Sequence, residues 1–200
     1  MDELKFAVIG NPVSHSLSPD IHLFFASQFQ LERYTYNKIK SNENDFERDI
    51  NDFFKNGGIG LNVTVPFKGL AYNLCDELDQ SAGLCKSVNT VLIDSGKLIG
   101  HSTDGQGLID DFLHKEITLE DSKILIIGAG GSAASIISSL LSHGKIKEIS
   151  ILNRTKSNAL RLLDLFETNR LLMHEEGDEY DVVINTTPMS MNVDDIILPP

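Results

Sequence analysis

Hydrophobic positions along the chain follow two patterns: short apolar or alternating runs, and segments with an apolar residue every three or four positions. The first pattern is typical of strands and the second of amphipathic helices. In the first half of the chain, the expected strands cover residues 6–9, 34–39, 59–63, 88–93 and 97–99, and the expected helices cover residues 18–29, 45–54 and a segment that starts at Pro66. Because strands alternate with helices, this half is predicted to form a mostly parallel sheet with an antiparallel hairpin at its end.

Serine, proline and glycine mark the ends of two of these helices. Ser18 followed by Pro19 has the form of an N-cap and a first-turn proline, so the first helix is predicted to open there. Gly57-Gly58 is predicted to end the second helix, because glycine is common just past a helix C-terminus.

The second half of the chain restarts the alternation at residue 123. Strands are expected at residues 123–127, 148–152 and 180–184, with helices over residues 131–143 and 156–166, which together make a βαβαβ unit. The join falls at residues 102–105, followed by a connecting helix over 107–114, and no Pro- or Ser-rich linker marks it. The sequence therefore predicts an α/β fold of two domains, residues 1–103 with a mixed sheet and residues 104–200 with a Rossmann-like sheet.

Composition and charge narrow the class of protein. Hydrophobic residues make up 41% and charged residues 23% of the 200 positions, as in ordinary globular domains. Lys and Arg number 17 against 29 Asp and Glu, a net charge of −12, so nucleic acid and anionic membrane surfaces are not expected as partners. An anionic small substrate would need local lysines, arginines or backbone N–H groups.

Leader, cysteine and histidine patterns exclude further classes. The N-terminus lacks the basic and apolar regions of a secretory leader, and no apolar run reaches the roughly 18 residues of a spanning helix, so we expect a cytoplasmic protein. The two cysteines, Cys75 and Cys85, are expected to be reduced thiols. The six histidines show no ligand spacing, and no metal site is predicted.

A glycine-rich turn separates a strand from a helix in the second half. It has the G-x-G-x-x-A spacing and reads Gly128-Ala129-Gly130-Gly131-Ser132-Ala133. Gly128 allows the tight turn, Gly130 lets the backbone approach a pyrophosphate, and Ala133 keeps the helix close to the sheet. The free N–H groups of the helix N-terminus favour an anion, so the turn predicts a dinucleotide site.

The end of the next strand favours NADP over NAD. An NAD site places Asp or Glu there to hold the ribose 2′-hydroxyl, whereas this strand ends in Asn153-Arg154-Thr155. The guanidinium of Arg154 offers a planar pair of donors to a 2′-phosphate, with Asn153 and Thr155 as further donors. A solvated arginine at a helix start is the alternative interpretation.

Another polar segment, Asn62 to Lys68, ends a strand and enters a helix in the first half. Alternation places Asn62 and Thr64 on one face of the strand, and Lys68 follows on the first helical turn. The carboxyl end of such a strand is where α/β sheets usually bind ligands. A surface lysine is an equally good interpretation of Lys68 from spacing alone.

The order of the motifs resembles the shikimate dehydrogenase family, of the biosynthetic NADP-dependent type, over nearly all of the chain. The resemblance rests on the glycine-rich turn, Asn153-Arg154-Thr155 and five further segments: Gly10-Asn11-Pro12 with His15-Ser16-Leu17-Ser18-Pro19, Asn62 to Lys68, Val88-Asn89-Thr90, Ser102-Thr103-Asp104-Gly105, and Asn185-Thr186-Thr187-Pro188. It implies a substrate-binding domain over residues 1–103 and an NADP-binding domain over residues 104–200. It also implies reversible NADPH-dependent reduction of 3-dehydroshikimate to shikimate, in aromatic amino-acid biosynthesis, by a monomer or homodimer.

The resemblance also assigns roles to individual residues. It implies that Ser16 and Ser18 bind the substrate carboxylate, that Thr64, Asn89 and Asp104 hold its ring hydroxyls, and that Lys68 and Asp104 form the catalytic pair, with Lys68 also touching substrate. An ammonium beside a carboxylate can polarise a ketone and donate a proton to its oxygen, which agrees with this assignment. The cofactor would be bound by residues 128–133, by Asn153, Arg154 and Thr155, and by Thr186 and Thr187.

Several positions depart from the family pattern and keep alternatives open. Lys86-Ser87 replaces a common Gly-Ala pair, Asn158 replaces a frequent arginine beside the 2′-phosphate, and Ser190 replaces a frequent glycine. The resemblance further implies a C-terminal segment after Pro200, with more strands, helices and a substrate-binding glutamine. The alternatives are a quinate/shikimate dehydrogenase using NAD or NADP, a catalytically incomplete fragment that only binds substrate, and a methylene-tetrahydrofolate dehydrogenase, which fits the motifs less well.

Overall fold

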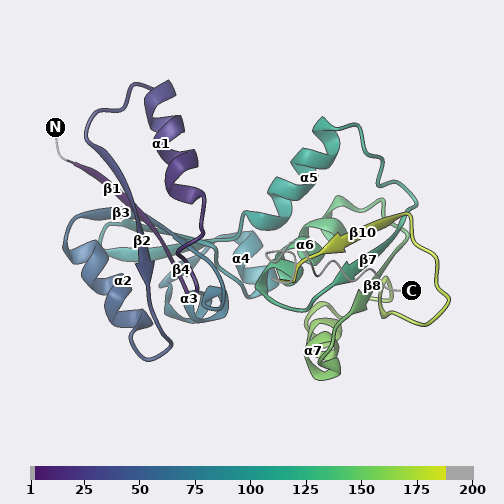
Figure 1. Ribbon diagram of the computed structural model, residues 1–200. Helices are drawn as coiled ribbons and strands as arrows, with labels where there is room; N and C mark the ends of the chain where they lie inside the picture. The colour runs from purple at the N-terminus through teal and green to yellow at the C-terminus, as the bar shows by residue number, and fades with distance from the viewer. Residues whose placement is uncertain (1–2, 188–200) are drawn as a thin grey trace. The chain divides into compact units, whose positions relative to one another are not determined.

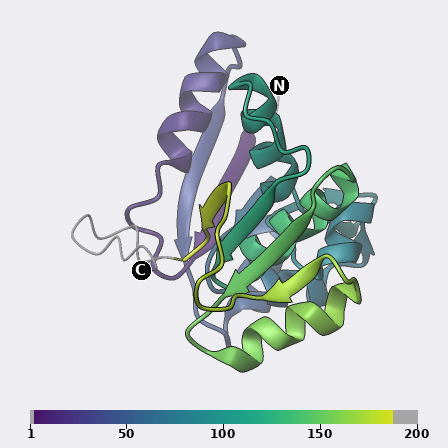
Figure 2. The same cartoon turned by 90° about the vertical axis from the view of Figure 1, so that its right-hand side faces the viewer.

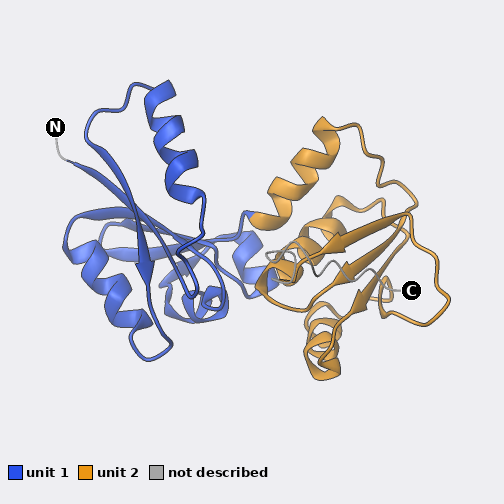
Figure 3. Cartoon of the chain, viewed as in Figure 1, with its two compact units in different colours: residues 1–103 blue, residues 104–200 orange. Residues whose placement is uncertain are grey.

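The structure is a computed structural model that describes residues 3–187, and the chain forms two compact units. Unit 1 spans residues 1–103 and unit 2 spans residues 104–200 (Figure 3). Each unit has its own sheet, a mixed one of six strands in unit 1 and a parallel one of four in unit 2 (Figure 1). The predicted α/β fold class is confirmed.

Unit 1 is built on a sheet whose strand order is β2-β1-β3-β5-β6-β4. Its strands are β1 (Leu4–Gly10), β2 (Tyr34–Lys40), β3 (Gly58–Val63), β4 (Glu77–Leu78), β5 (Thr90–Asp94) and β6 (Lys97–His101). Its helices are α1 (Ser18–Gln28), α2 (Phe46–Lys55), α3 (Lys68–Leu74) and α4 (Gln80–Cys85). Strands β1, β2 and β3 are parallel, and β5 is antiparallel to both β3 and β6.

The predicted hairpin is formed by β5 and β6, but it is not at the end of the sheet as expected. The two-residue strand β4 lies outside it and pairs with β6 in parallel. Asp76 fixes this edge, because its N–H donates to the Leu98 carbonyl at 2.9 Å and its Oδ2 accepts from the Leu98 N–H at 2.8 Å. Two residues give no readable alternation, so the sequence pattern missed this strand.

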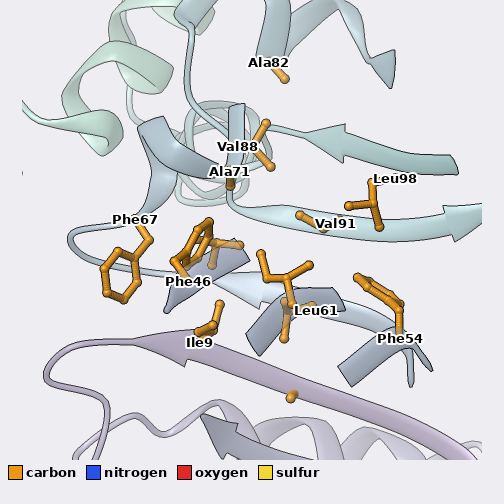
Figure 4. Packing of buried hydrophobic residues seen from close by; sticks show 13 residues of the cluster. Ile9, Phe46, Phe54, Leu61, Phe67, Ala71, Ala82, Val88, Val91 and Leu98 are labelled. Carbon is orange, nitrogen blue, oxygen red and sulfur yellow. The ribbon is translucent and has the colours of Figure 1, made fainter. Parts of the chain in front are cut away.

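A hydrophobic core lies between the sheet of unit 1 and helices α2 and α3. The predicted apolar face of α2 is confirmed, because Phe46, Ile50 and Phe54 are buried. Figure 4 shows Phe46 beside Phe67 from the turn before α3, and their ring centroids are 4.9 Å apart. Burying a side chain of this size contributes about 1.5–3 kcal/mol relative to leaving it exposed. This core fixes the end of β3 and the start of α3.

Two helices start at positions that differ from the sequence prediction. Ser18 was expected as the N-cap of α1, but the helix begins at Ser18, Leu17 occupies the cap position, and no side chain caps it. Helix α3 begins at Lys68 rather than at Pro66, which lies in a turn after a cis Val65–Pro66 peptide bond. Lys68 is therefore the first residue of its helix. The start of α2 at Phe46 agrees with prediction within one residue.

Unit 2 carries a parallel sheet in the order β10-β7-β8-β9 (Figure 2). Its strands are β7 (Lys123–Ile127), β8 (Glu148–Leu152), β9 (Leu171–Met173) and β10 (Val182–Asn185), and its helices are α5 (Asp104–His114), α6 (Gly131–His143) and α7 (Lys156–Phe166). The central strand β7 buries Ile124, Leu125 and Ile126, as expected of a parallel strand covered on both faces. Strand β9 was not predicted.

Helix α5 begins at Asp104, three residues before the predicted start. Its first turn packs closely on α6, because the Gly105 N–H donates to Ser135 Oγ at 3.0 Å. A Cβ atom at Gly105 would lie 2.2 Å from the Ser135 carbonyl oxygen, so only glycine fits at this contact.

Residues 3–187 show neither a membrane-spanning helix nor a cluster of metal ligands. Within this range no helix is long and apolar enough to cross a bilayer. The same residues contain no group of three or more His, Cys, Asp or Glu side chains arranged to hold a metal ion.

Candidate functional site

The first candidate site is one edge of the unit 1 sheet. Strands β1 and β3 end there, and β5 begins and β6 ends at the same edge because β5 runs antiparallel to both neighbours. In the register, Asn62 is opposite Thr90, and Thr90 is opposite His101. Residues that follow β3, precede β5 and follow β6 therefore meet, and these are Thr64, Asn89 and Thr103.

Backbone hydrogen bonds hold this edge together. The Val63 N–H donates to the Asn89 carbonyl at 2.7 Å, and the Asn89 N–H donates to the His101 carbonyl at 3.0 Å. The Val88 N–H donates to the Lys68 carbonyl at 3.0 Å. The first residue of α3 is thus tied by its main chain to the segment that carries Asn89. The two predicted segments, Asn62 to Lys68 and Val88-Asn89-Thr90, are neighbours in the structure.

Several hydrogen bonds hold the Asn89 side chain at this edge. It is only 9% exposed, and its Nδ2 donates to Thr103 Oγ1 at 2.9 Å. Its Oδ1 accepts from the Thr103 N–H at 3.1 Å and from Thr90 Oγ1 at 3.1 Å. A buried amide with this many partners is held in one orientation. Thr64, also predicted to bind ring hydroxyls, is half-buried and follows Val63, whose N–H donates to the Asn89 carbonyl.

The two predicted serines lie where α1 begins, with Ser16 in the preceding loop and Ser18 as the first residue of the helix. Ser16 Oγ donates to Ser18 Oγ at 3.1 Å and accepts from the Ser18 N–H at 3.3 Å. The pair is half-buried, so hydroxyl groups are available at the surface of this loop. Such a pair can donate two hydrogen bonds to a carboxylate.

Tyr36 is hydrogen-bonded to the end of β3, and the sequence analysis did not select it. Its hydroxyl donates to Asn62 Oδ1 at 2.6 Å, and Asn62 Nδ2 donates to Thr90 Oγ1 at 3.1 Å. Burial raises the pKa of Tyr36 to about 12, although a hydrogen bond with the Ser18 side chain acts in the opposite direction. The available sequence signal was alternation in β2, which points Tyr36 inward and requires a partner for its hydroxyl.

The second candidate site is the glycine-rich turn of unit 2. Gly128 has a φ of +114°, in the region that favours glycine, and a Cβ there would lie 2.3 Å from Thr186 Oγ1. A Cβ at Gly130 would meet nothing within 4 Å, so the backbone is open on that side. No side chain caps the N-terminus of α6. These features fit the phosphates of a dinucleotide, which bind backbone N–H groups at such a helix start.

The predicted 2′-phosphate segment lies between β8 and α7. Arg154 and Thr155 are exposed, and Asn153 Nδ2 donates to the Thr155 carbonyl at 2.8 Å. The Gly128 N–H donates to the Leu152 carbonyl at 2.8 Å, so this segment and the glycine-rich turn follow adjacent strands. The structure therefore brings the two predicted nucleotide-binding segments together.

The other predicted cofactor residues follow β10. The Thr186 N–H and Oγ1 both donate to the Ile127 carbonyl, at 2.8 and 2.9 Å, and Thr187 Oγ1 donates to Asn185 Oδ1 at 2.7 Å. Thr186 therefore lies against the glycine-rich turn. Ser190, one of the departures from the family pattern, lies outside the described residues.

Asp104, predicted as catalytic, is part of unit 2. Its Oδ2 lies 3.3 Å from Ser132 Oγ, which belongs to the glycine-rich turn. Ser132, predicted to touch cofactor, therefore contacts the predicted catalytic carboxylate within the same unit. Lys68, its predicted partner, is part of unit 1.

Lys86 occupies a position where the family commonly has glycine. It is exposed and ends α4 with a φ of +50°, in the left-handed region. The glycine common at this position in the family suits that conformation without strain.

Comparison with known proteins assigns both units to the same enzyme family. A family model described as the shikimate dehydrogenase substrate binding domain matches residues 8–91, and one described as shikimate / quinate 5-dehydrogenase matches residues 112–194. The chain is 40% identical to the shikimate dehydrogenase (NADP(+)) of Acinetobacter baylyi, over 98% of this chain and 76% of that relative. It is 41% identical to the enzyme of the same name from Vibrio campbellii, over 94% of this chain and 69% of that relative.

Solved structures agree with this. The Ael1 enzyme of Pseudomonas putida matches with a TM-score of 0.84 at 32% identity, over 99% of this chain and 73% of that one. The shikimate 5-dehydrogenase of Thermus thermophilus, in complex with NADP(H) and shikimate, matches with a TM-score of 0.82 at 31% identity, over 92% of this chain and 68% of that one.

Proposed function

The chain belongs to the shikimate dehydrogenase family, and from this premise we propose that it catalyses the reversible NADPH-dependent reduction of 3-dehydroshikimate to shikimate. The observation that carries the proposal is the edge of the unit 1 sheet, where the segment with Thr64 and Lys68 lies beside the segment with Asn89. This places the chain in the shikimate pathway of aromatic amino-acid biosynthesis.

We propose that unit 1 binds the substrate. Ser16 and Ser18 would donate hydrogen bonds to its carboxylate, which meets the need for local donors in a chain of net charge −12. The amide of Asn89 and the hydroxyl of Thr64 would bind ring hydroxyls. A site built to hydrogen-bond substrate hydroxyls discriminates strongly against analogues that lack them.

Unit 2 would bind the cofactor. The turn over residues 128–133 would hold the pyrophosphate, Arg154 with Asn153 and Thr155 would hold the 2′-phosphate, and Thr186 and Thr187 would lie near the nicotinamide. NADPH supplies the hydride when bound. The open backbone at Gly130 and the uncapped start of α6 support this fit.

Lys68 and Asp104 would form the acid–base pair. In reduction, the Lys68 ammonium donates its proton to the substrate oxygen as the carbonyl becomes an alcohol. Asp104 orients Lys68 and binds a ring hydroxyl of the substrate. In oxidation, neutral Lys68 accepts the hydroxyl proton. General acid catalysis of this kind contributes roughly 10²- to 10⁴-fold to rate.

The proposal includes the setting of the enzyme. Cys75 and Cys85 are free thiols, which fits the reducing cytoplasm. The assembly proposed is a monomer or a homodimer, to be measured by light scattering.

A direct assay tests this function. The purified chain is mixed with shikimate and either NADP or NAD at matched concentrations, and the absorbance of reduced nicotinamide is followed. We expect reduction that prefers NADP, and a loss of roughly 10²-fold or more in kcat for Lys68→Ala. Lys55→Ala, an exposed lysine at the end of α2, is the control and should match the unmodified chain.

Other outcomes have clear meanings. Equal turnover of Lys68→Ala and the unmodified chain would remove Lys68 from the mechanism. Faster oxidation of quinate than of shikimate would favour the quinate/shikimate class. Absence of turnover from a folded chain that still binds shikimate would reject the enzymatic proposal.

A further inference from the structure

Two serines of α6 bind the start of α5 within unit 2. Ser132 Oγ donates to Asp104 Oδ2 at 3.3 Å, and Ser135 Oγ accepts from the Gly105 N–H at 3.0 Å. Ser132 and Ser135 are three positions apart, so they lie on the same face of α6. One face of α6 therefore contacts two consecutive residues of α5.

The two hydrogen bonds fix different parts of α5. The bond to Ser135 holds the main chain at Gly105, and Ser135 is only 3% exposed, so water does not replace it there. An aspartate on a fixed main chain can still rotate about its two side-chain bonds. The bond from Ser132 restricts this rotation of the Asp104 carboxylate.

Ser132 also belongs to the glycine-rich turn, where it is the second residue of α6. Its main-chain N–H is among those at a helix start that have no carbonyl partner within the helix and that phosphates bind. Its hydroxyl instead contacts the carboxylate of Asp104. The main chain and the side chain of Ser132 are thus suited to different partners.

The bond from Ser132 is compatible with a bound substrate. An ionised carboxylate only accepts hydrogen bonds, so the hydrogen of this bond comes from Ser132. The two oxygens of a carboxylate offer about four acceptor positions, and Ser132 uses one of them. The carboxylate can therefore accept from a substrate hydroxyl while its bond to Ser132 persists.

We propose that Ser132 is a positioning residue for the reaction, and that its hydroxyl holds the Asp104 carboxylate in the orientation that the substrate requires. This rests on the function proposed above, in which Asp104 binds a ring hydroxyl and belongs to the acid–base pair. The contact of Ser132 with cofactor is then made by its main chain. Without the hydroxyl, the carboxylate samples more orientations, and fewer of them suit substrate binding and catalysis.

Ser132→Ala tests this inference, because it removes one oxygen and keeps the main-chain N–H in a helix that alanine favours. Shikimate and NADP binding to the full chain are measured by calorimetry, and kcat and KM are measured in the assay. We expect kcat/KM for shikimate at saturating NADP to fall roughly tenfold, as for the loss of one hydrogen bond to a charged group, with the dissociation constant for NADP unchanged.

Two further variants complete this comparison. Ser132→Thr returns a hydroxyl to this half-buried position and should recover most of the lost kcat/KM. Ser142→Ala is the matched control, since it removes a serine hydroxyl from the last turn of the same helix, where the hydroxyl donates to the Ser138 carbonyl. It should equal the unmodified chain in all four quantities.

A double-mutant cycle separates positioning from general loss of structure. The dissociation constant for shikimate is measured in Ser132→Ala, in Asp104→Ala and in the variant with both changes. If the hydroxyl acts through the carboxylate, Ser132→Ala weakens shikimate binding in the unmodified chain and has no further effect once Asp104 is alanine. The same fold-change in both backgrounds would assign Ser132 a purely structural role and overturn the inference.

The two proposals fail in different ways. A higher dissociation constant for NADP in Ser132→Ala, with kcat/KM for shikimate unchanged at saturating NADP, would assign the hydroxyl to the cofactor. That result would overturn the role of Ser132 and leave the proposed function intact. Absence of shikimate binding and oxidation by the unmodified chain would overturn both.

Discussion

His22 lies among aromatic side chains of β2 and is half-buried between α1 and the sheet. Its ring stacks on Tyr36, and its Nδ1 is 3.4 Å from the Tyr34 hydroxyl. Burial lowers the pKa of His22 below its ordinary value of 6.5. The folded protein therefore binds a proton at this site less readily than the unfolded chain does.

This difference predicts a pH dependence of stability. Above the ordinary pKa of 6.5, His22 is neutral in both states and its contribution to stability is complete. As the pH falls below that value, the unfolded chain takes up the proton first and the free energy of unfolding decreases. His22→Phe keeps a ring for stacking and cannot be protonated. We expect its free energy of unfolding, measured in urea, to decrease less between about pH 7.5 and about pH 5.5.

The control for this experiment is His15→Gln, which replaces an exposed histidine of the same unit and retains His22 with its neighbours. It should show the same change with pH as the unmodified chain. A His22→Phe variant with the full decrease would show that other groups cause the acid sensitivity of unit 1.

Single residues differed in how far the sequence could identify them. The motifs selected Ser16, Ser18, Lys68 and Asn89, because each lies in a short segment with a recognisable spacing. Tyr36 and Thr103 were not selected as site residues, since their importance depends on hydrogen bonds to Asn62 and Asn89 from other strands. Cross-strand partners of this kind depend on register, which local sequence does not specify.

At the level of elements, the junction of β8 and α7 carries the proposed choice between NADP and NAD. Parallel strands β7 and β8 end side by side, so the glycine-rich turn and Arg154 lie at one edge. Arg154→Ala removes the proposed charged donor to the 2′-phosphate. Because hydrogen bonds to charged groups contribute roughly 1.5–3 kcal/mol, we expect KM for NADP to rise roughly 10- to 100-fold and KM for NAD to change little.

The matched control is Arg161→Ala, an exposed arginine in helix α7, which follows the segment of Arg154. Its KM values should equal those of the unmodified chain. A similar rise in KM for both cofactors in Arg154→Ala would contradict the 2′-phosphate assignment.

Long elements were predicted well and short ones were not. Strand β7 and helices α6 and α7 have the predicted bounds, because five to thirteen residues display a period clearly. Strands β4 and β9 have two and three residues and form through pairing with β6 and β8. Helix α4 has six residues, and Asp79 caps it by accepting from the Ala82 N–H at 2.7 Å. Contacts with distant residues, not local patterns, create the two short strands.

For the whole molecule, two units with separate sheets imply separate responses to the two ligands. We expect hydrogen exchange to slow first in residues 62–68 and 88–90 when shikimate is added, and in residues 128–134 and 153–156 when NADP is added. A ligand at 100 times its dissociation constant stabilises its unit by about 2.7 kcal/mol, which mass spectrometry detects as delayed exchange. Protection of unit 1 alone by NADP would contradict the proposed division of roles.

The contact between Gly105 and α6 has a consequence for recombining such enzymes. Asp104 is the first residue of α5, and Gly105, where no side chain fits, packs this helix against α6 of unit 2. Lys68 is the first residue of α3, which belongs to unit 1. A chimaera spliced at the boundary between residues 103 and 104 would therefore inherit the proposed proton donor from one parent and its carboxylate from the other. Recombination between homologues at this boundary therefore changes the pairing of the proposed proton donor with its carboxylate, as well as the combination of substrate and cofactor preferences.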